Sequence, residues 1–385
     1  MSTHVPAPPT PTQANGRRPR RRRWLIALIT TLGVIALGAG GVFFWLQQQQ
    51  QCVKAPDPTR SGAISEYCPP ERYGPLSGAM TSGPDGNLWY VDSQGKIARF
   101  TLPSGAITEF AAPTAPNQVA YGGMVRGADG NIWYVANYTL GRVSVTGAST
   151  EFAPPKNLGL SGGIAAGPDG TLWLTMGANN PDQKGALLKV TPPKDGATTP
   201  TIAEVPLQAK LQANTHLGYI ATASDGSLWA STFVSSGDTT QSTDFIRITP
   251  AGAITQIPAA ISGAVTALAA GPDGAMWFIS ASWQGQTGEI GRVSPTGDVT
   301  VFRVSEVGQP GSQSLALGPD GNLWFSTKDG GIARITPSGK VTTFSLPHTG
   351  GLVAGITAGP DGGVWFLLGY PQPFQPTSRF VRITP

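Results

Sequence analysis

Residue types that commonly carry out catalysis are scarce in this sequence. Its 385 residues include two cysteines and three histidines, and 12% of the residues are charged, against about 25% in average proteins. No Ser-His-Asp set, cysteine nucleophile or phosphate-binding loop is recognisable, because the glycine-rich strings have the form of turns. Glycine and proline are the abundant residues, with 51 and 35 copies, as expected for a turn-rich β protein.

Acidic residues are absent before Asp57, so the first part of the chain is purely basic. The net charge of +4 comes from 26 basic and 22 acidic side chains, and six of the basic ones are arginines within residues 17–23. Without these six, 20 basic side chains stand against 22 acidic ones, a net charge of −2. The rest of the chain therefore lacks the basic surface of a nucleic-acid binder, and we expect no nucleic-acid partner.

An uncharged apolar segment comes directly after the arginines. Residues 1–23 have the composition of a disordered basic tail, and residues 24–46 carry no charge over 23 positions, which is enough for a helix that spans a bilayer. Trp24 and Trp45 stand near its two ends, and the arginines before it predict a cytoplasmic N-terminus. We therefore predict a single-pass anchor in a bacterial cell membrane.

The residues after the anchor are predicted to lie outside the cytoplasm, as a tether (47–60) and a single domain (61–385). The alternative to an anchor is a cleaved signal peptide. Residues 21–25 faintly resemble a twin-arginine signal, and residues 36–39 include small side chains suited to cleavage. The apolar run continues beyond that point, which favours the anchor.

An eight-residue stretch of the form GPDGNLWF recurs seven times in the domain. Its tryptophans recur every 40 to 56 residues, a period typical of propeller or solenoid arrays. They are Trp89, Trp133, Trp173, Trp229, Trp277, Trp324 and Trp365.

One repeat holds four short strands. Pro, Asp and Gly form a tight turn, and the residues after it, such as NLWF (322–325), alternate in polarity as a strand does. A third strand resembling IARI (332–335) and a fourth resembling KVTTF (340–344) complete the repeat. Four strands in about 45 residues make one propeller blade, and the tryptophan offers a large apolar surface to the next blade. We predict an all-β, seven-bladed propeller of four-stranded blades.

The two ends of the domain predict how its ring is completed. VRITP (381–385) has the form of a third strand with no fourth strand after it. SGAISEYCPP (61–70) resembles the fourth-strand segment SGAITEFAAP (104–113). We expect Ala63–Tyr67 to supply the outer strand of the last blade, so that N- and C-terminal strands pair and no edge stays open.

The two cysteines are Cys52, in the tether, and Cys68, just after that strand. Extracytoplasmic compartments permit disulfides, so we expect the pair to form one that ties the tether to the closing strand. Two free thiols are the alternative.

Four links between second and third strands are longer than a tight turn requires: residues 177–186, 232–244, 280–288 and 368–378. Such links gather on one face of a propeller, where long loops usually carry function. They contain Phe233, Trp283, Tyr370 and Phe374, aromatic candidates for binding a glycan, a peptide or a small molecule. The alternative is that these side chains fold over their own loops.

The repeat resembles that of the virginiamycin B lyase (streptogramin lyase) family of seven-bladed propellers, over residues 61–385. The resemblance implies that the ring of streptogramin B antibiotics is opened by elimination, with a magnesium ion. Such a reaction needs a base and a Lewis acid. By the resemblance, these come from a His just before Gly-Ile-Thr in a first strand and a Glu three residues after the blade tryptophan.

This sequence departs from that pattern. The seven positions corresponding to the His are Gly78, Gly122, Gly162, Gly218, Thr266, Gln313 and Ala354. The seven corresponding to the Glu are Asp92, Ala136, Met176, Thr232, Ser280, Thr327 and Leu368.

Only three weak catalytic candidates therefore remain: His216, His348 and Asp92. No metal-ligand set is evident, so we expect magnesium only if lyase activity exists. We interpret the chain as a membrane-anchored extracytoplasmic propeller that binds a ligand or acts as a scaffold. The alternative is a streptogramin B lyase-like enzyme with a displaced active site.

Overall fold

The chain divides into two units, residues 1–51 and 52–385, and all described residues belong to the second. The computed structural model describes residues 57–69, 76–92, 96–110, 123–136, 139–153, 160–176, 186–194, 198–207, 215–236, 239–261, 263–281, 288–307, 314–347, 351–369 and 378–385. Within these ranges no helix is long and apolar enough to cross a bilayer. The predicted tail, the predicted anchor at 24–46 and most of the tether lie outside them.

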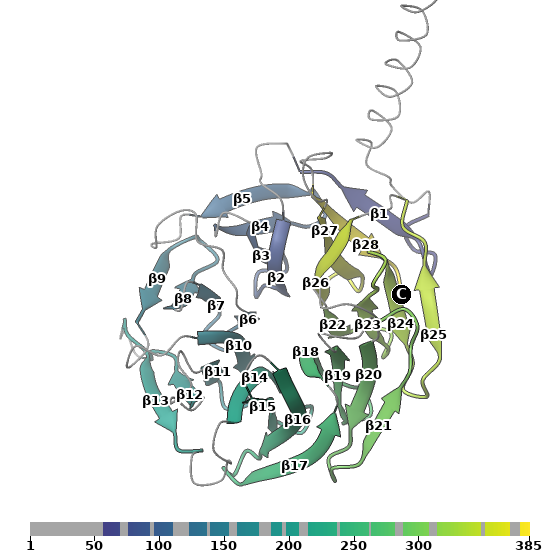
Figure 1. Ribbon diagram of the computed structural model, residues 1–385. Helices are drawn as coiled ribbons and strands as arrows, with labels where there is room; N and C mark the ends of the chain where they lie inside the picture. Colours follow the sequence, from purple (N-terminus) through teal and green to yellow (C-terminus); the bar gives the residue numbers. More distant parts are fainter. Residues whose placement is uncertain are drawn as a thin grey trace, which may run out of the picture. The chain divides into compact units, whose positions relative to one another are not determined.

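The described residues form 28 strands, in seven antiparallel sheets of four strands each (Figure 1). The first sheet contains β2 (Leu76–Ser82), β3 (Leu88–Asp92), β4 (Ile97–Thr101) and β5 (Ala106–Phe110). The second contains β6 (Met124–Arg126), β7 (Ile132–Ala136), β8 (Thr139–Val143) and β9 (Ser149–Phe152). The third contains β10 (Leu160–Ala166), β11 (Leu172–Met176), β12 (Ala186–Thr191) and β13 (Thr201–Val205). The fourth contains β14 (Thr215–Thr222), β15 (Leu228–Ser236), β16 (Thr239–Ile248) and β17 (Ile254–Ile261).

The remaining three sheets have the same strand order. The fifth contains β18 (Ala264–Ala270), β19 (Met276–Ala281), β20 (Gly288–Val293) and β21 (Val299–Phe302). The sixth contains β22 (Leu315–Leu317), β23 (Leu323–Ser326), β24 (Ile332–Ile335) and β25 (Val341–Phe344). The seventh contains β26 (Leu352–Ala358), β27 (Val364–Gly369), β28 (Arg379–Ile383) and, at its outer edge, β1 (Ile64–Tyr67).

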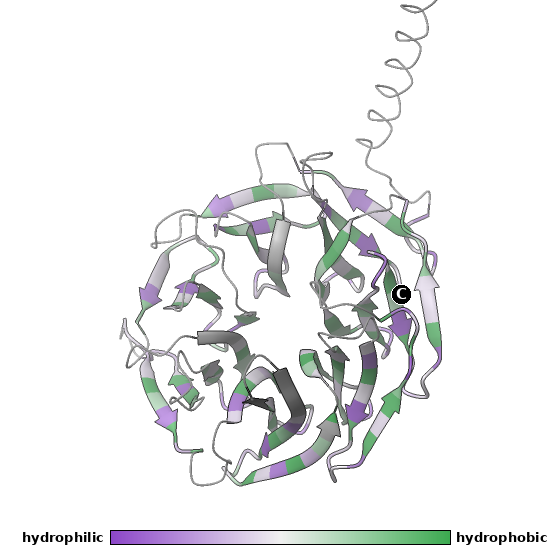
Figure 2. Ribbon diagram, viewed as in Figure 1, coloured by the Kyte–Doolittle hydropathy of each residue, from purple (hydrophilic) through white to green (hydrophobic). Residues whose placement is uncertain are grey.

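The seven sheets are arranged around a ring (Figure 1). The first strand of each sheet contacts the first strand of the next, and β26 of the seventh sheet contacts β2 of the first. The fourth strands form the rim, where β5 and β13 carry both hydrophilic and hydrophobic residues (Figure 2). The predicted all-β, seven-bladed propeller of four-stranded blades is confirmed.

The hydrophobic core is divided into seven clusters, each between two neighbouring blades. The cluster between the first two blades joins Trp89 of β3 to Met124 and Tyr134 of the second sheet. The cluster between the last and first blades joins Trp365 and Phe380 to Phe100. Because each repeated tryptophan is buried in such a cluster, its predicted packing role between blades is confirmed.

The seventh blade combines strands from both ends of the domain. Strand β1 pairs antiparallel with β28, in a register that sets Ile64 opposite Ile383 and Tyr67 opposite Phe380. Between the two strands, the carboxylate of Glu66 accepts a hydrogen bond of 2.7 Å from the guanidinium of Arg379, and both side chains are fully buried.

One link differs from its prediction. Residues 232–244 are expected to form a long loop, but β15 continues to Ser236 and β16 begins at Thr239, with Thr232 opposite Asp244 and Val234 opposite Ser242. Valine and threonine favour extended backbone, so the link elongates both strands instead of forming a loop.

Candidate functional site

The antiparallel order gives the ring two different faces. The Pro-Asp-Gly turns between first and second strands lie on the same face as the turns between third and fourth strands; we call it the turn face. The opposite face, which we call the link face, holds the links between second and third strands and those between blades. A candidate site must be sought separately on each.

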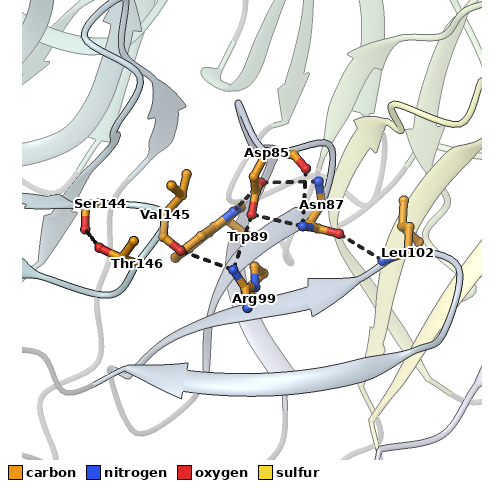
Figure 3. Close-up of polar contacts among 8 residues, drawn as sticks. All are labelled: Asp85, Asn87, Trp89, Arg99, Leu102, Ser144, Val145 and Thr146. Atoms are coloured by element: carbon orange, nitrogen blue, oxygen red, sulfur yellow. Dashed lines mark hydrogen bonds and ion pairs between the residues drawn. The ribbon is translucent and has the colours of Figure 1, made fainter.

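On the turn face, the turn aspartate, the repeated tryptophan and the basic residue of the third strand form a set that recurs from blade to blade. This set connects the turn to the core and to the neighbouring blade, and we call it the clasp. In the first blade, the carboxylate of Asp85 accepts a hydrogen bond of 3.0 Å from Nε1 of Trp89, and Nδ2 of Asn87 donates to the same carboxylate (Figure 3). The guanidinium of Arg99 on β4 lies 3.6 Å from the carboxylate of Asp85. It also donates a hydrogen bond of 3.1 Å to the carbonyl of Val145, in the turn between β8 and β9 of the second sheet (Figure 3).

The guanidinium also covers aromatic rings. The Cζ atom of Arg99 lies 5.9 Å from the ring centre of Trp89 and 5.8 Å from that of Phe110 on β5. The two rings are stacked at 5.1 Å. The arginine is therefore held by a carboxylate, a carbonyl and two aromatic faces at once, which fixes an otherwise flexible side chain.

The clasp recurs around the ring. Tryptophan Nε1 donates to the turn aspartate over 2.9 to 3.1 Å in the first, second, fifth, sixth and seventh blades. In the third blade the hydroxyl of Thr171 stands between Trp173 and Asp169. Arg247 and Arg292 reach carbonyls of the next blade, as Arg99 does. These contacts make the turn face a structural face.

In five blades the pKa of the turn aspartate is lowered in the folded protein. For Asp320, burial raises the pKa, but hydrogen bonds from Asn322 and Trp324, the backbone and Arg334 lower it by more, so the net shift is downward. The pKa of Asp169 falls to about 2 by the same balance of burial against hydrogen bonds from Thr171 and Lys189. None of these carboxylates is suited to act as a base near neutral pH.

On the link face, the fourth blade brings together two residues singled out from the sequence. His216 on β14 lies opposite Phe233 on β15, and their rings stack at 5.1 Å with an angle of 18° between planes. Both are half-buried. Tyr219, three residues further along β14, keeps 47% of its surface exposed. Phe233 thus lies in a strand and not in a loop.

A cleft of about 610 Å³ opens between the fifth and sixth blades. It is lined by Gly288, Glu289, Arg303, Val304, Ser305, Val307 and Lys328. The first two belong to β20, residues 303–307 are the first part of the link between the blades, and Lys328 lies in the turn between β23 and β24. By topology the cleft therefore belongs to the link face.

Several predicted site residues lie outside the described residues: Cys52, Trp283, His348, Tyr370 and Phe374. Cys68 comes directly after β1 and is half-buried, but its predicted pairing with Cys52 stays a prediction. Asp92 is the last residue of β3 and pairs with Leu76. Among the described residues, the structure brings together only His216 and Phe233 of the sequence candidates.

Comparison with known proteins places the chain in a family. Its sequence matches the model of the Virginiamycin B lyase family over residues 33–206 and 200–370. The chain belongs to this family. No curated protein matches the sequence.

Solved structures agree with that membership. A streptogramin B lyase structure is 25% identical, with a TM-score of 0.60 over 83% of this chain and 97% of that chain. A catalytically inactive histidine-to-alanine variant of virginiamycin B lyase from Staphylococcus aureus with quinupristin is 22% identical, with a TM-score of 0.62 over 83% and 99% of the two chains. The extracellular domain of a hybrid two-component system from B. thetaiotaomicron is 16% identical, with a TM-score of 0.56 over 82% of this chain and 39% of that chain. At this identity the similarity shows only that the fold is shared.

The position at which the virginiamycin B lyase resemblance expects a histidine has a distinctive structure. In five blades it falls in or beside a β-bulge of the innermost strand, a feature that re-aims a side chain. In the fourth blade the bulge holds Gly218, and the next residue's backbone amide donates to the hydroxyl of Ser231. In the fifth blade it holds Thr266, and in the seventh blade Ala354 lies beside it and still pairs with Leu367.

The position at which a glutamate is expected lies at or near the end of the second strand, except in the fourth blade, where β15 continues beyond Thr232 to Ser236. Four such residues are fully buried: Met176, Thr232, Ser280 and Leu368. Among the described residues, no three His, Cys, Asp or Glu side chains are grouped as a metal site would require. The donor set at these described positions therefore does not fit a magnesium ion, which prefers carboxylate and water oxygens.

Sequence reasoning missed the residues of the clasp and of the cleft. The turn aspartate was interpreted only as a turn former, although an aspartate four residues before each of the seven repeated tryptophans could have indicated a bond to the indole. The sequence did not indicate that Arg303 and Lys328 share a cleft, because they lie outside the repeated motif and 25 residues apart. Only the fold places them at one cleft.

Proposed function

We propose that this protein is a membrane-anchored, extracytoplasmic propeller that binds a ligand or acts as a scaffold, and that it is not a streptogramin lyase. The observation that carries the proposal is which residues occupy the positions at which the family resemblance expects a histidine and a glutamate. Gly218, Thr266 and Ala354 stand where a histidine base is expected, and buried Thr232 and Leu368 are among those standing where a glutamate is expected.

Elimination at a lactone requires removal of a proton next to the ester carbonyl and stabilisation of the resulting charge. Glycine, alanine and leucine have no group that can accept a proton, and threonine is a very weak base. Loss of a positioned general base alone lowers a rate by about 10²–10⁴-fold. The positions expected to hold a histidine thus offer no imidazole base, and Asp92 is the only acidic residue among the seven positions expected to hold a glutamate.

The link face is the proposed binding surface. The turn face is occupied by clasps, whereas the link face has the cleft at Arg303 and the aromatic pair of His216 and Phe233. Trp283, Tyr370 and Phe374 belong to links that start and end on this same face. Aromatic surface beside polar groups suits a glycan, a peptide or a small molecule.

A lyase with a displaced site is the second candidate, favoured by family membership and by His216. This histidine lies on an innermost strand, two residues before the expected position of the base. If turnover were detected, His216→Ala and His348→Ala would identify the base, and loss of turnover in either variant would establish this candidate.

Magnesium binding separates the two candidates. We expect titration of Mg²⁺ into the full-length protein, with quinupristin present, to give no heat beyond dilution. Calcium and sodium chloride at equal ionic strength serve as controls for non-specific effects. A saturable, EDTA-reversible Mg²⁺ signal that appears only with the antibiotic would contradict the binding-protein proposal.

A further inference from the structure

The cleft between the fifth and sixth blades has walls that are fixed by backbone contacts. The amide of Gly288 at the start of β20 donates to the carbonyl of Val307, and the amide of Lys328 donates over 2.8 Å to the carbonyl of Glu306. The link between the blades is therefore bonded to both of them. A cleft held in this way is formed before any ligand arrives, which lowers the entropy lost on binding.

Two buried valines set the direction of the side chains on this link. Val304 and Val307 are 7% and 3% exposed and belong to the cluster between the two blades. The side chains of Arg303 and Ser305, which alternate with Val304, are exposed. Because Arg303 is exposed beside buried Val304, its guanidinium lies at the surface and not in the core.

The two cations of the cleft are available. Within the described part of the chain, neither Arg303 nor Lys328 forms an ion pair, in contrast to the clasp arginines of five blades, which face an aspartate. Both are exposed, while Glu289 across the cleft is half-buried. The lining thus presents two positive charges and one negative charge.

We propose that this cleft binds the carboxylate of a peptide or amino-acid-like ligand, and this inference deepens the proposed binding function on which it rests. The planar guanidinium of Arg303 can grip a carboxylate with two parallel hydrogen bonds, and Lys328 adds a second charge. Glu289 accepts a hydrogen bond from an amide or ammonium group beside that carboxylate. The lining's net charge of +1 matches a monoanion better than a phosphate dianion.

The test uses ligand-observed ¹⁹F NMR with the full-length protein in detergent micelles. The probe is N-trifluoroacetyl-dialanine with a free carboxylate, and its matched control is the same compound as a C-terminal amide. We expect the free acid to show line broadening on addition of protein and the amide to show none. Replacing both cations, as Arg303→Ala/Lys328→Ala, should weaken binding at least about tenfold, because it removes charge-assisted hydrogen bonds.

The matched control variant is Lys194→Ala/Lys340→Ala, which removes the same charge from two exposed side chains away from the cleft and should bind the free acid normally. Glu289→Gln should weaken binding less than the double variant. The inference is overturned if the ¹⁹F line of the free acid does not broaden or if the amide broadens equally. It is also overturned if Arg303→Ala/Lys328→Ala binds the free acid as tightly as the unaltered protein. Turnover of quinupristin would overturn the proposed function separately and leave carboxylate binding to be judged by these spectra.

Discussion

At the scale of single residues, the aspartate of each turn serves both the turn and the core. The carboxylate of Asp320 accepts hydrogen bonds from the indole of Trp324, from Asn322 and from the guanidinium of Arg334. The indole is fully buried, so its N–H would have no water to replace the aspartate. The sequence predicted the turn and the buried tryptophan from a single repeat, but not their bond, because a turn explains Pro-Asp-Gly without it.

We expect Asp320→Ala to lower the free energy of unfolding by about 1–3 kcal/mol, the penalty for leaving a buried donor unsatisfied. The matched control is Asp329→Ala, an exposed aspartate in the same blade, which should change stability by less than about 0.5 kcal/mol. Urea denaturation followed by tryptophan fluorescence measures both. Equal effects of the two substitutions would show that the clasp contributes nothing of its own.

The clasps also predict an acid transition. The pKa values of Asp85, Asp169, Asp225, Asp320 and Asp361 are all lowered in the folded protein. Such groups contribute stability above their unfolded pKa of about 3.9, and lose it as the pH falls through the folded value, which is about 2 for Asp169. We expect the free energy of unfolding to decline between about pH 4 and pH 2. A free energy that stays constant from pH 5 to pH 2.5 would contradict this.

At the scale of elements, the seventh blade depends on a strand that is more than 300 residues away in sequence from its neighbour. The likeness of residues 61–70 to 104–113 indicated a fourth-strand segment, and β1 does pair with β28. The ion pair between Glu66 and Arg379 could not be foreseen, because charged side chains are rarely buried and their pairing joins the two ends of the domain. Opposite charges became neighbours only through the register of the two strands.

We expect Glu66→Ala to destabilise the protein by about 3–5 kcal/mol, since it leaves the buried guanidinium of Arg379 without its counter-charge. The double variant Glu66→Met/Arg379→Met should recover most of that loss, because it removes both charges. Glu109→Ala, which breaks the half-buried, solvent-accessible pair with Lys96, is the control and should change stability by less than about 1 kcal/mol. Thermal and urea unfolding of the four proteins checks the series.

At the scale of the whole molecule, the two faces of the ring differ in how far the sequence predicts them. The turn face repeats seven times, so its period alone indicates the fold and the number of blades. The link face does not repeat, and its cleft combines residues from two blades and the link between them. Periodicity gives no information about such a combination, which is why the candidate site needed the structure.

The arrangement in the cell is predicted from residues 17–46 alone. An antibody against a C-terminal epitope should bind intact, wall-stripped cells, because the propeller is expected outside the membrane. An antibody against an N-terminal epitope should bind only after permeabilisation. A mature protein in the medium that begins near Ala39 would instead show that the apolar segment is a cleaved signal.

The most direct test of the central claim is a single-turnover reaction. Full-length protein in excess over quinupristin, with Mg²⁺, is incubated for a day and analysed by chromatography and mass spectrometry. Ring opening by elimination adds no water, so the product has the mass of the parent and differs in retention time. We predict that the antibiotic is recovered unchanged. Conversion to an isomer of equal mass, abolished by EDTA, would contradict the claim that this propeller binds without lyase chemistry.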